Sequence, residues 1–139
     1  MDDRLLGDSV LDASVLDDIV LDDIVFIHGL EIETIIGVYA RERNIKQTVL
    51  IDLEMTLASQ PVAGSDDLRS TVDYDAVSIK VTSEVKKTEY QLIETLAEKI
   101  AELVLSKFAV KSLKLKLSKP GAVKNAKNVG TVIHRPSAR

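Results

Sequence analysis

The segment SLKLKLSKPGAV, residues 112–123, decides the fold class of this chain. Leucine occupies every second position in its first seven residues, with serine or lysine at the others. Because successive side chains of a β-strand point to opposite faces of a sheet, this alternation predicts a strand with one buried face and one exposed face. Pro120 and Gly121 predict a turn that ends the strand.

Lys119 breaks the pattern at the end of this strand, because it has the same parity as the three leucines. The residue before a proline avoids the helical region, so we expect the backbone to stay extended and to turn Lys119 toward the apolar face. Partial burial disfavours the charged form of a lysine, which makes it available as a base or nucleophile. The alternative is a lysine that simply extends to solvent.

The rest of the chain adds three strands to this one. Residues 24–34 are rich in β-branched and large apolar side chains, and residues 48–57 alternate between apolar and polar side chains. Both patterns predict strands, and we expect these two to pair antiparallel. A last strand is predicted over residues 129–134.

Two helices are predicted between the second and third strands. Asp73 is a candidate N-cap for a helix that runs to about Lys87. Residues 88–91, TEYQ, match the capping-box pattern and predict the start of a second helix there. The fold class is therefore α+β, with two strands, two helices and two strands in chain order.

The composition excludes several kinds of site. The chain has 139 residues, 45% of them hydrophobic and 29% charged, which is typical of one globular domain. It has no cysteine and two histidines, so disulfides, thiolate nucleophiles and a three-histidine metal site are excluded. The net charge of −4 predicts no nucleic-acid partner, and no stretch approaches the ~18 apolar residues of a membrane helix.

Residues 1–23 differ from the rest of the chain, because they carry eight aspartates and one arginine. They match neither a signal peptide nor a transit peptide, so we expect a cytoplasmic protein. We expect a disordered acidic extension over residues 1–23, a domain over residues 24–135 and a short tail over residues 136–139. An acidic docking arm is the alternative for the extension.

Three more polar residues are candidates for a functional site. Glu94 lies beside the apolar stripe of the second predicted helix, Glu42 lies in a loop between Arg41 and Arg43, and Tyr74 opens the first predicted helix. Each also has an ordinary structural interpretation: a solvated helix margin for Glu94, surface charge for Glu42 and an exposed phenol for Tyr74. The pattern alone leaves both interpretations open.

Four short strings, taken together, resemble the bacterial dihydroneopterin aldolase family. The strings are Ile36-Gly37-Val38-Tyr39 followed by Glu42, Asp73-Tyr74, Leu92-Ile93-Glu94, and LSKPGAV at residues 117–123. The resemblance covers about residues 24–135, and LSKPGAV is its most specific part.

The resemblance implies the tunnelling fold, in which an antiparallel four-stranded sheet has both helices on one face. Subunits of this fold close into a barrel as a tetramer, and two such rings stack into a homo-octamer with active sites between subunits. Closure of the ring would also pair the open edges of each small sheet, which otherwise promote aggregation.

The family reaction is a retro-aldol cleavage in tetrahydrofolate biosynthesis. It converts 7,8-dihydroneopterin into 6-hydroxymethyl-7,8-dihydropterin and glycolaldehyde. The resemblance implies no cofactor, no metal and no Schiff base, because the C6=N5 imine of the pterin accepts the electron pair. Re-addition of glycolaldehyde to the intermediate would also give a 2′-epimerase side activity.

The resemblance assigns a role to each candidate residue. Lys119 is the expected general base, helped by an ordered water and by Glu42, which also contacts the substrate. Tyr74 from the adjacent subunit is expected to bind the substrate and to pass a proton to the intermediate. Glu94 and the backbone of Ile93 are expected to bind the pterin ring.

Two other functions remain as alternatives. A dihydroneopterin triphosphate 2′-epimerase of the same fold would need a cationic site for the triphosphate, and the LSKPGA string disfavours it. A non-catalytic pterin-binding oligomer is disfavoured because Glu42, Tyr74, Glu94 and Lys119 are all present.

Overall fold

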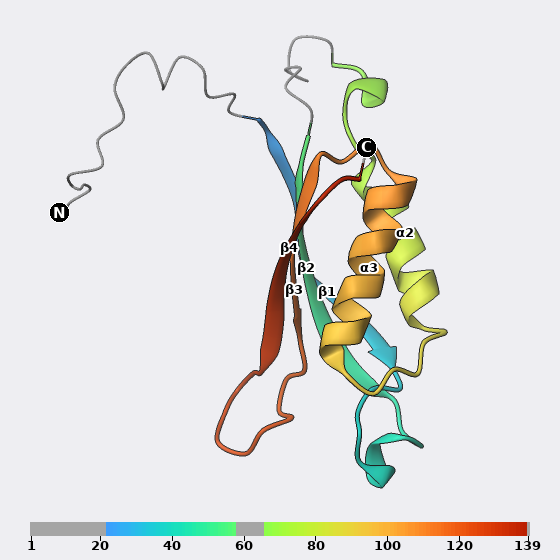
Figure 1. Cartoon of the computed structure of the whole chain (residues 1–139), viewed down its shortest axis with the longest axis vertical. Helices are drawn as coiled ribbons and strands as arrows, with labels where there is room; N and C mark the ends of the chain where they lie inside the picture. The colour runs from blue at the N-terminus through green and yellow to red at the C-terminus, as the bar shows by residue number, and fades with distance from the viewer. Residues whose placement is uncertain (1–21, 58–65, 139) are drawn as a thin grey trace, which may run out of the picture.

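A computed structural model describes residues 22–57 and 66–138 of the chain (Figure 1). Apart from Asp22 and Asp23, the predicted acidic extension over residues 1–23 lies outside the described residues, and so does Arg139 of the predicted tail.

Four antiparallel strands form one sheet, in the spatial order β1-β2-β3-β4. Their bounds are β1 Ile24–Thr34, β2 Gln47–Thr56, β3 Ser112–Ser118 and β4 Gly130–Pro136. The predicted bounds of β1 and β3 are confirmed, and the predicted antiparallel pairing of β1 with β2 is confirmed as well. The last strand, β4, extends two residues beyond the predicted end at His134.

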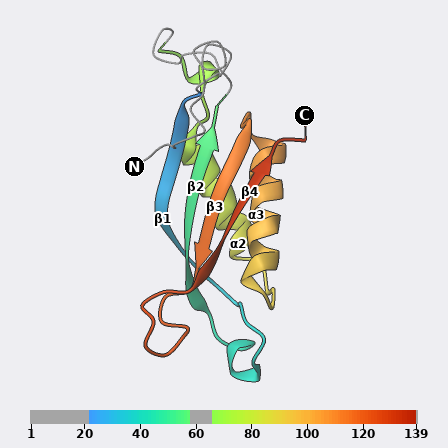
Figure 2. The ribbon, with the colours of Figure 1, turned by 60° about the vertical axis from the view of Figure 1, so that its left-hand side comes forward.

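Two helices, α2 (Tyr74–Val85) and α3 (Ile93–Lys107), lie between β2 and β3 in the chain. Both pack on the same face of the sheet, and no helix of residues 22–57 and 66–138 lies on the other face (Figures 1 and 2). Two short 3₁₀ helices, η1 (Ala40–Glu42) and η3 (Leu68–Ser70), lie in the connections before and after β2. The architecture is therefore a two-layer α+β subunit.

The core lies between the sheet and the helices, and the alternation of the strands creates it. In β2 and β3 every second side chain is fully buried; these residues are Val49, Ile51, Leu53, Met55, Leu113, Leu115 and Leu117. The helices contribute Val77, Val81, Val85, Leu96, Ala97, Ile100 and Val104 to the same cluster. Lys114 and Lys116 are exposed on the opposite face of β3, as the alternation predicts.

The predicted start of the second helix is wrong. The N-cap of α3 is Leu92 rather than Thr88, so the helix begins at Ile93. The hydroxyl of Thr88 instead donates to the carbonyl oxygen of Val85 at 2.8 Å and lies 3.2 Å from the hydroxyl of Thr34 in β1. These contacts fix residues 86–92 as a connector between α2 and α3, because the hydroxyl that would cap a helix is already bonded elsewhere.

The outer edges of β1 and β4 pair with no other strand in the described part of the subunit. Unpaired edges offer free N–H and C=O groups to another chain. Among residues 22–57 and 66–138, neither α2 nor α3 nor any shorter helix has the length and hydrophobicity of a membrane span.

Candidate active site

An ion pair at the end of β3 is the centre of the candidate site. Nζ of Lys119 donates to Oε2 of Glu42 at 2.9 Å. Only 12% of the Lys119 side chain and 14% of the Glu42 side chain are exposed. The prediction that Lys119 turns toward the apolar side and is partly buried is confirmed, and the alternative of a lysine extended to solvent is wrong.

Other hydrogen bonds fix the carboxylate of Glu42 in place. Nε2 of Gln47 donates to Oε2 at 3.2 Å, and the backbone N–H of Tyr39 donates to Oε1 at 3.2 Å. The hydrogen bond from Lys119 lowers the pKa of Glu42 from 4.5 to about 2; partial burial opposes this shift, and the bonds from Gln47 and Tyr39 add to it. Glu42 is therefore ionised at neutral pH. The interpretation of Glu42 as an ordinary surface charge, which its loop position had left open, is wrong.

Gly37 provides the space that this carboxylate occupies. A Cβ atom built on Gly37 would collide with the carboxylate group of Glu42. The φ angle of Gly37 is +140°, a region that residues with side chains rarely adopt. Glycine at this position is thus required for the bonded position of Glu42.

Hydrogen bonds across the base of the turn after β3 fix the backbone of Lys119. The N–H of Lys119 donates to the carbonyl oxygen of Val129 at 2.8 Å, and Nδ2 of Asn128 donates to the hydroxyl of Ser118 at 3.0 Å. These bonds tie the two ends of the turn together directly beside the lysine.

The start of α3 lies close to this pair. Lys119 Nζ also approaches the carbonyl oxygen of Ile36 at 3.5 Å, and the N–H of the next residue, Gly37, donates to the carbonyl oxygen of Tyr90 at 3.3 Å. Tyr90 lies two residues before the N-cap of α3, so these contacts connect the Lys119–Glu42 pair with the predicted pterin-binding segment.

Ile93 and Glu94 occupy the first turn of α3. Ile93 packs against the core, whereas the side chain of Glu94 is exposed to solvent in the subunit. The first N–H groups of an α-helix have no intrahelical acceptor, so the backbone here offers donors beside an acceptor carboxylate. The geometry allows both a solvated helix margin and a ligand contact for Glu94.

Tyr74, in contrast, does not join the other candidates within one subunit. It is the first residue of α2, its side chain is 61% exposed, and it lines a shallow depression together with Val25. Val25 pairs with Met55, and Met55 pairs with Leu113, which lies six residues before Lys119 in the chain. At about 3.3 Å per strand residue, Leu113 and Lys119 are ~20 Å apart along the strand, so Tyr74 and Lys119 lie near opposite ends of the sheet.

Figure 1 shows the same separation: the start of α2 and the helix η1 lie at opposite ends of the subunit. The N-cap of α2 is Asp73, as predicted, and its carboxylate accepts hydrogen bonds from the N–H groups of Asp75 and Ala76. A site that combines Tyr74 with Lys119 therefore needs two subunits.

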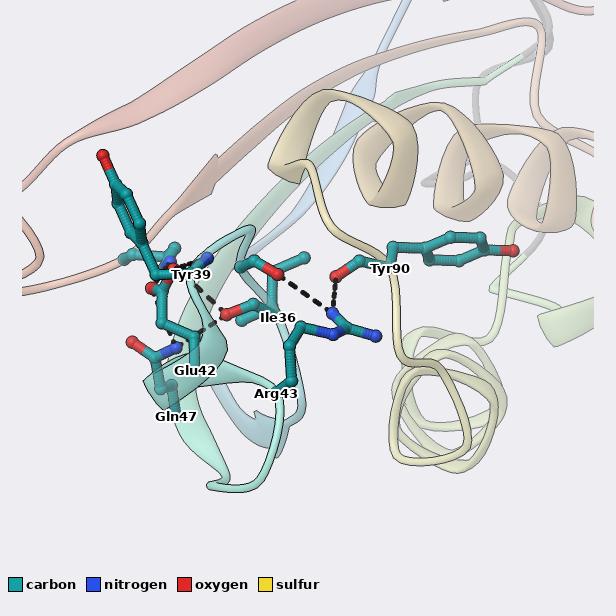
Figure 3. Close-up of polar contacts among 8 residues, drawn as sticks. Ile36, Tyr39, Glu42, Arg43, Gln47 and Tyr90 are labelled. Carbon is teal, nitrogen blue, oxygen red and sulfur yellow. Dashed lines mark hydrogen bonds and ion pairs between the residues drawn. The ribbon is translucent and has the colours of Figure 1, made fainter.

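Two polar residues of the site were not predicted. Gln47 was not predicted, although the sequence contains a signal for it. It has the same strand parity as the buried residues Val49 and Ile51, so it is a polar residue on an apolar face. Arg43 was noted only as a neighbour of Glu42, but its guanidinium donates to three backbone carbonyl oxygens in and beside the site. Figure 3 shows the bond to Tyr90.

The arrangement suits proton transfer. A lysine and a carboxylate in contact, both mostly buried, can exchange a proton with a hydroxyl group that reaches them. In the described ranges, 22–57 and 66–138, no three histidine, aspartate or glutamate side chains lie together in a way that could bind a metal ion.

Comparison with known proteins identifies the family to which a chain with this site belongs. A family model for FolB, dihydroneopterin aldolase, matches residues 25–134. Dihydroneopterin aldolase of Escherichia coli strain K12 is 42% identical over 111 residues, which are 80% of this chain and 91% of that enzyme.

Solved structures give the same result for the fold. The crystal structure of E. coli dihydroneopterin aldolase in complex with neopterin matches with a TM-score of 0.77 and 42% identity, over 81% of this chain and 98% of that one. Dihydroneopterin aldolase of Burkholderia thailendensis, bound to guanine, matches with a TM-score of 0.67 and 27% identity, over 83% of this chain and 91% of that one.

The shared fold and the identity to the E. coli enzyme define the class first: the chain is an aldolase of folate biosynthesis. More particularly, the chain belongs to the dihydroneopterin aldolase family. The resemblance based on four short strings is thereby confirmed.

Proposed function

We propose that the enzyme cleaves 7,8-dihydroneopterin into 6-hydroxymethyl-7,8-dihydropterin and glycolaldehyde. The observation that carries this proposal is the buried contact between Lys119 and Glu42, at the end of the subunit where α3 begins. The E. coli relative is named for this activity and was crystallised with neopterin, and the Burkholderia relative was crystallised with guanine, a ring with the same donor and acceptor edge as a pterin.

The products determine which bond breaks. The pterin product keeps one side-chain carbon and glycolaldehyde takes two, so the bond between the first and second side-chain carbons is cleaved. The hydroxyl on the second carbon loses its proton and becomes the aldehyde, and the electron pair of the broken bond passes to the C6=N5 imine of the pterin. The first carbon then takes up a proton, which completes the reaction without an external oxidant or reductant.

Lys119 is the proposed general base for the hydroxyl proton, with an ordered water as the relay. Glu42 has a pKa of about 2, so its carboxylate is too weak a base for this step. Its proposed roles are to orient the amine of Lys119 and to contact the side chain of the substrate.

The pterin ring is proposed to bind at the start of α3. A carboxylate can accept two parallel hydrogen bonds from a ring N–H and an exocyclic amine, and the exposed side chain of Glu94 is free to meet such an edge. The backbone of Ile93, in the first turn of the helix, is proposed to add a contact.

Tyr74 is proposed to act from the neighbouring subunit. The placement of Tyr74 and Lys119 near opposite ends of the sheet and the unpaired edges of β1 and β4 both support a ring in which each subunit completes its neighbour's site. We propose that four subunits close into a barrel through these edges and that two rings form a homo-octamer. Tyr74 then supplies the proton for the first side-chain carbon, and re-addition of glycolaldehyde gives a 2′-epimerase side activity.

Incubation of the purified protein with 7,8-dihydroneopterin, followed by chromatography of the pterins, tests the reaction. We expect 6-hydroxymethyl-7,8-dihydropterin and a smaller amount of the 2′-epimer. We expect the same rate with EDTA, because the electron acceptor belongs to the substrate. Epimer alone would favour an epimerase, and no conversion by an assembled protein would leave a pterin-binding oligomer.

A further inference from the structure

Arg43 joins two segments that are distant in the sequence. Its Nη1 donates to the carbonyl oxygen of Gly37 at 3.0 Å and to that of Tyr90 at 3.1 Å, and its Nη2 donates to that of Glu89 at 2.6 Å. Gly37 belongs to the loop that carries Glu42, defined here as residues 37–46, and the other two acceptors belong to the connector before α3. Figure 3 shows the guanidinium between these two segments.

The two segments carry different parts of the candidate site. The loop places Glu42 against Lys119, and the connector ends at Leu92, from which Ile93 and Glu94 follow. Apart from the bonds of Arg43, the two segments share the bond from the N–H of Gly37 to the carbonyl oxygen of Tyr90, which at 3.3 Å is long. The bonds of the guanidinium to the connector, at 2.6 and 3.1 Å, are therefore shorter than this direct bond between the loop and the connector.

An arginine suits this role better than any other side chain. A planar guanidinium offers five N–H donors in a fixed fork, so it can bond to carbonyl groups on two segments at once. A lysine ammonium is a single flexible donor group and cannot reproduce that fork. The two bonds from Nη1 of Arg43 are partly buried, which strengthens them relative to bonds in open solvent, whereas the bond from Nη2 is exposed.

We propose that Arg43 is a positioning residue, which sets the distance between the Lys119–Glu42 pair and the pterin-binding start of α3. The proposal rests on the proposed function. A substrate that is bound at its ring by α3 must present its side-chain hydroxyl to Lys119, so the spacing between the two segments decides whether bound substrate reacts. A displacement of ~1 Å at such a site can cost about a hundredfold in rate.

The test compares Arg43→Ala and Arg43→Lys with Lys46→Ala. Lys46 lies in the same loop, is exposed, and is a matched control for the loss of one positive charge. For each protein we would measure the oligomeric state, the melting temperature, kcat and KM for 7,8-dihydroneopterin, the Kd of the product pterin, and amide hydrogen exchange in residues 37–46 and 86–92.

For Arg43→Ala we expect kcat to fall about ten- to hundredfold in an assembled protein, with faster amide exchange in both segments. Arg43→Lys should recover little of the loss, and Lys46→Ala should behave as the wild type. The proposal is overturned if exchange changes in the loop alone or in neither segment, or if Arg43→Lys restores wild-type kcat. It is also overturned if only the melting temperature falls.

The exchange measurement separates this proposal from the proposed function. If the wild type does not cleave dihydroneopterin, the proposed function fails. In that case the amide hydrogen exchange of residues 37–46 and 86–92 in the Arg43 variants, together with their Kd for the product pterin, still tests the role of Arg43. If the wild type turns over and the Arg43 variants match it, the role of Arg43 fails and the proposed function stands.

Discussion

The two ends of the subunit differ in how firmly they fix their polar residues. At the end where β3 stops, Glu42 accepts hydrogen bonds from Lys119, Gln47 and the backbone of Tyr39. At the other end Tyr74 is exposed at the start of α2, beside a shallow depression. The carboxylate of Glu42 is therefore held by hydrogen bonds, whereas the phenol of Tyr74 is exposed to solvent in the subunit.

This difference agrees with the proposal that each active site combines residues of two subunits. The Lys119–Glu42 pair is positioned by contacts within one chain, so its geometry does not depend on assembly. Tyr74 has a defined backbone position, because Asp73 caps its helix, and its exposed phenol is proposed to act in the site of a neighbouring subunit. The four predictions that follow test this division.

The largest effect is expected for Lys119→Ala. Removal of a general base typically costs about 10²–10⁴ in rate. Affinity for the product pterin should stay nearly normal, because the proposed ring contacts belong to α3. Steady-state kinetics and calorimetry with the product measure the two effects separately.

Lys114→Ala and Lys116→Ala are the matched controls for Lys119→Ala. They remove the same charge from the same strand but on its exposed face. If either control costs as much turnover as Lys119→Ala, or if Lys119→Ala keeps wild-type turnover, Lys119 is not the base.

The second prediction concerns complementation between subunits. Lys119→Ala and Tyr74→Phe should each be nearly inactive alone, because each lacks one half of every site. In mixed assemblies from co-expression with two affinity tags, about a quarter of the sites combine the intact halves, since each half is present in half of the subunits.

We therefore expect mixed assemblies to recover roughly a quarter of the wild-type rate. Mixtures of separately purified homo-oligomers that do not exchange subunits serve as the control. Mixed assemblies as inactive as both parents would mean that Tyr74 and Lys119 act within one subunit, whereas an active Tyr74→Phe parent would mean that the phenol of Tyr74 has no role in the reaction.

The third prediction concerns Glu94→Ala. It removes the proposed acceptor for two pterin donors and leaves them unpaired, at about 1–3 kcal/mol for each group. Pterin affinity should fall at least about tenfold with the fold intact. Glu102→Ala, a surface carboxylate of the same helix paired with Lys99, is the control. Equal binding by Glu94→Ala and the wild type would identify Glu94 as a solvated helix margin.

The smallest effect is on stability and depends on pH. The pKa of Glu42 is about 2 in the folded protein and ordinarily 4.5, so its ion pair stabilises the fold above pH 4.5 and loses this effect as the pH falls toward 2. Glu42→Gln should lower the free energy of unfolding at pH 7 by on the order of 1 kcal/mol. The difference from the wild type should shrink between pH 4.5 and pH 2.

Urea unfolding of the wild type and Glu42→Gln at several pH values measures this difference. Glu102→Gln is the control, because it removes a carboxylate that is exposed on the surface of α3. A difference for Glu42→Gln that stays constant down to pH 2 would show that the ion pair with Lys119 is not its source.

Strand alternation was enough to predict much of this subunit. It gave the bounds of β3 and the partial burial of Lys119, because both depend only on parity within a few residues of chain. It could also have identified Gln47, a polar residue at a buried parity, as a residue with a specific partner.

Contacts between distant segments could not be predicted in the same way. The capping-box pattern at Thr88 failed because the hydroxyl meets Thr34, 54 residues away. The role of Arg43 could not be predicted either, because its acceptors are backbone carbonyl oxygens up to 47 residues away, which no pattern of side chains indicates. The separation of Tyr74 from Lys119 required the strand register, which no single segment contains.

The collision that a Cβ at Gly37 would make with Glu42 has a consequence for how this enzyme tolerates variation. Gly37 is buried but is not one of the residues of the apolar core, and its φ of +140° means that alanine there strains the loop backbone. The methyl group would also displace the carboxylate of Glu42 from Lys119. In a survey of all substitutions scored for both abundance and growth without added folate, alanine at position 37 should therefore lower growth more than it lowers abundance.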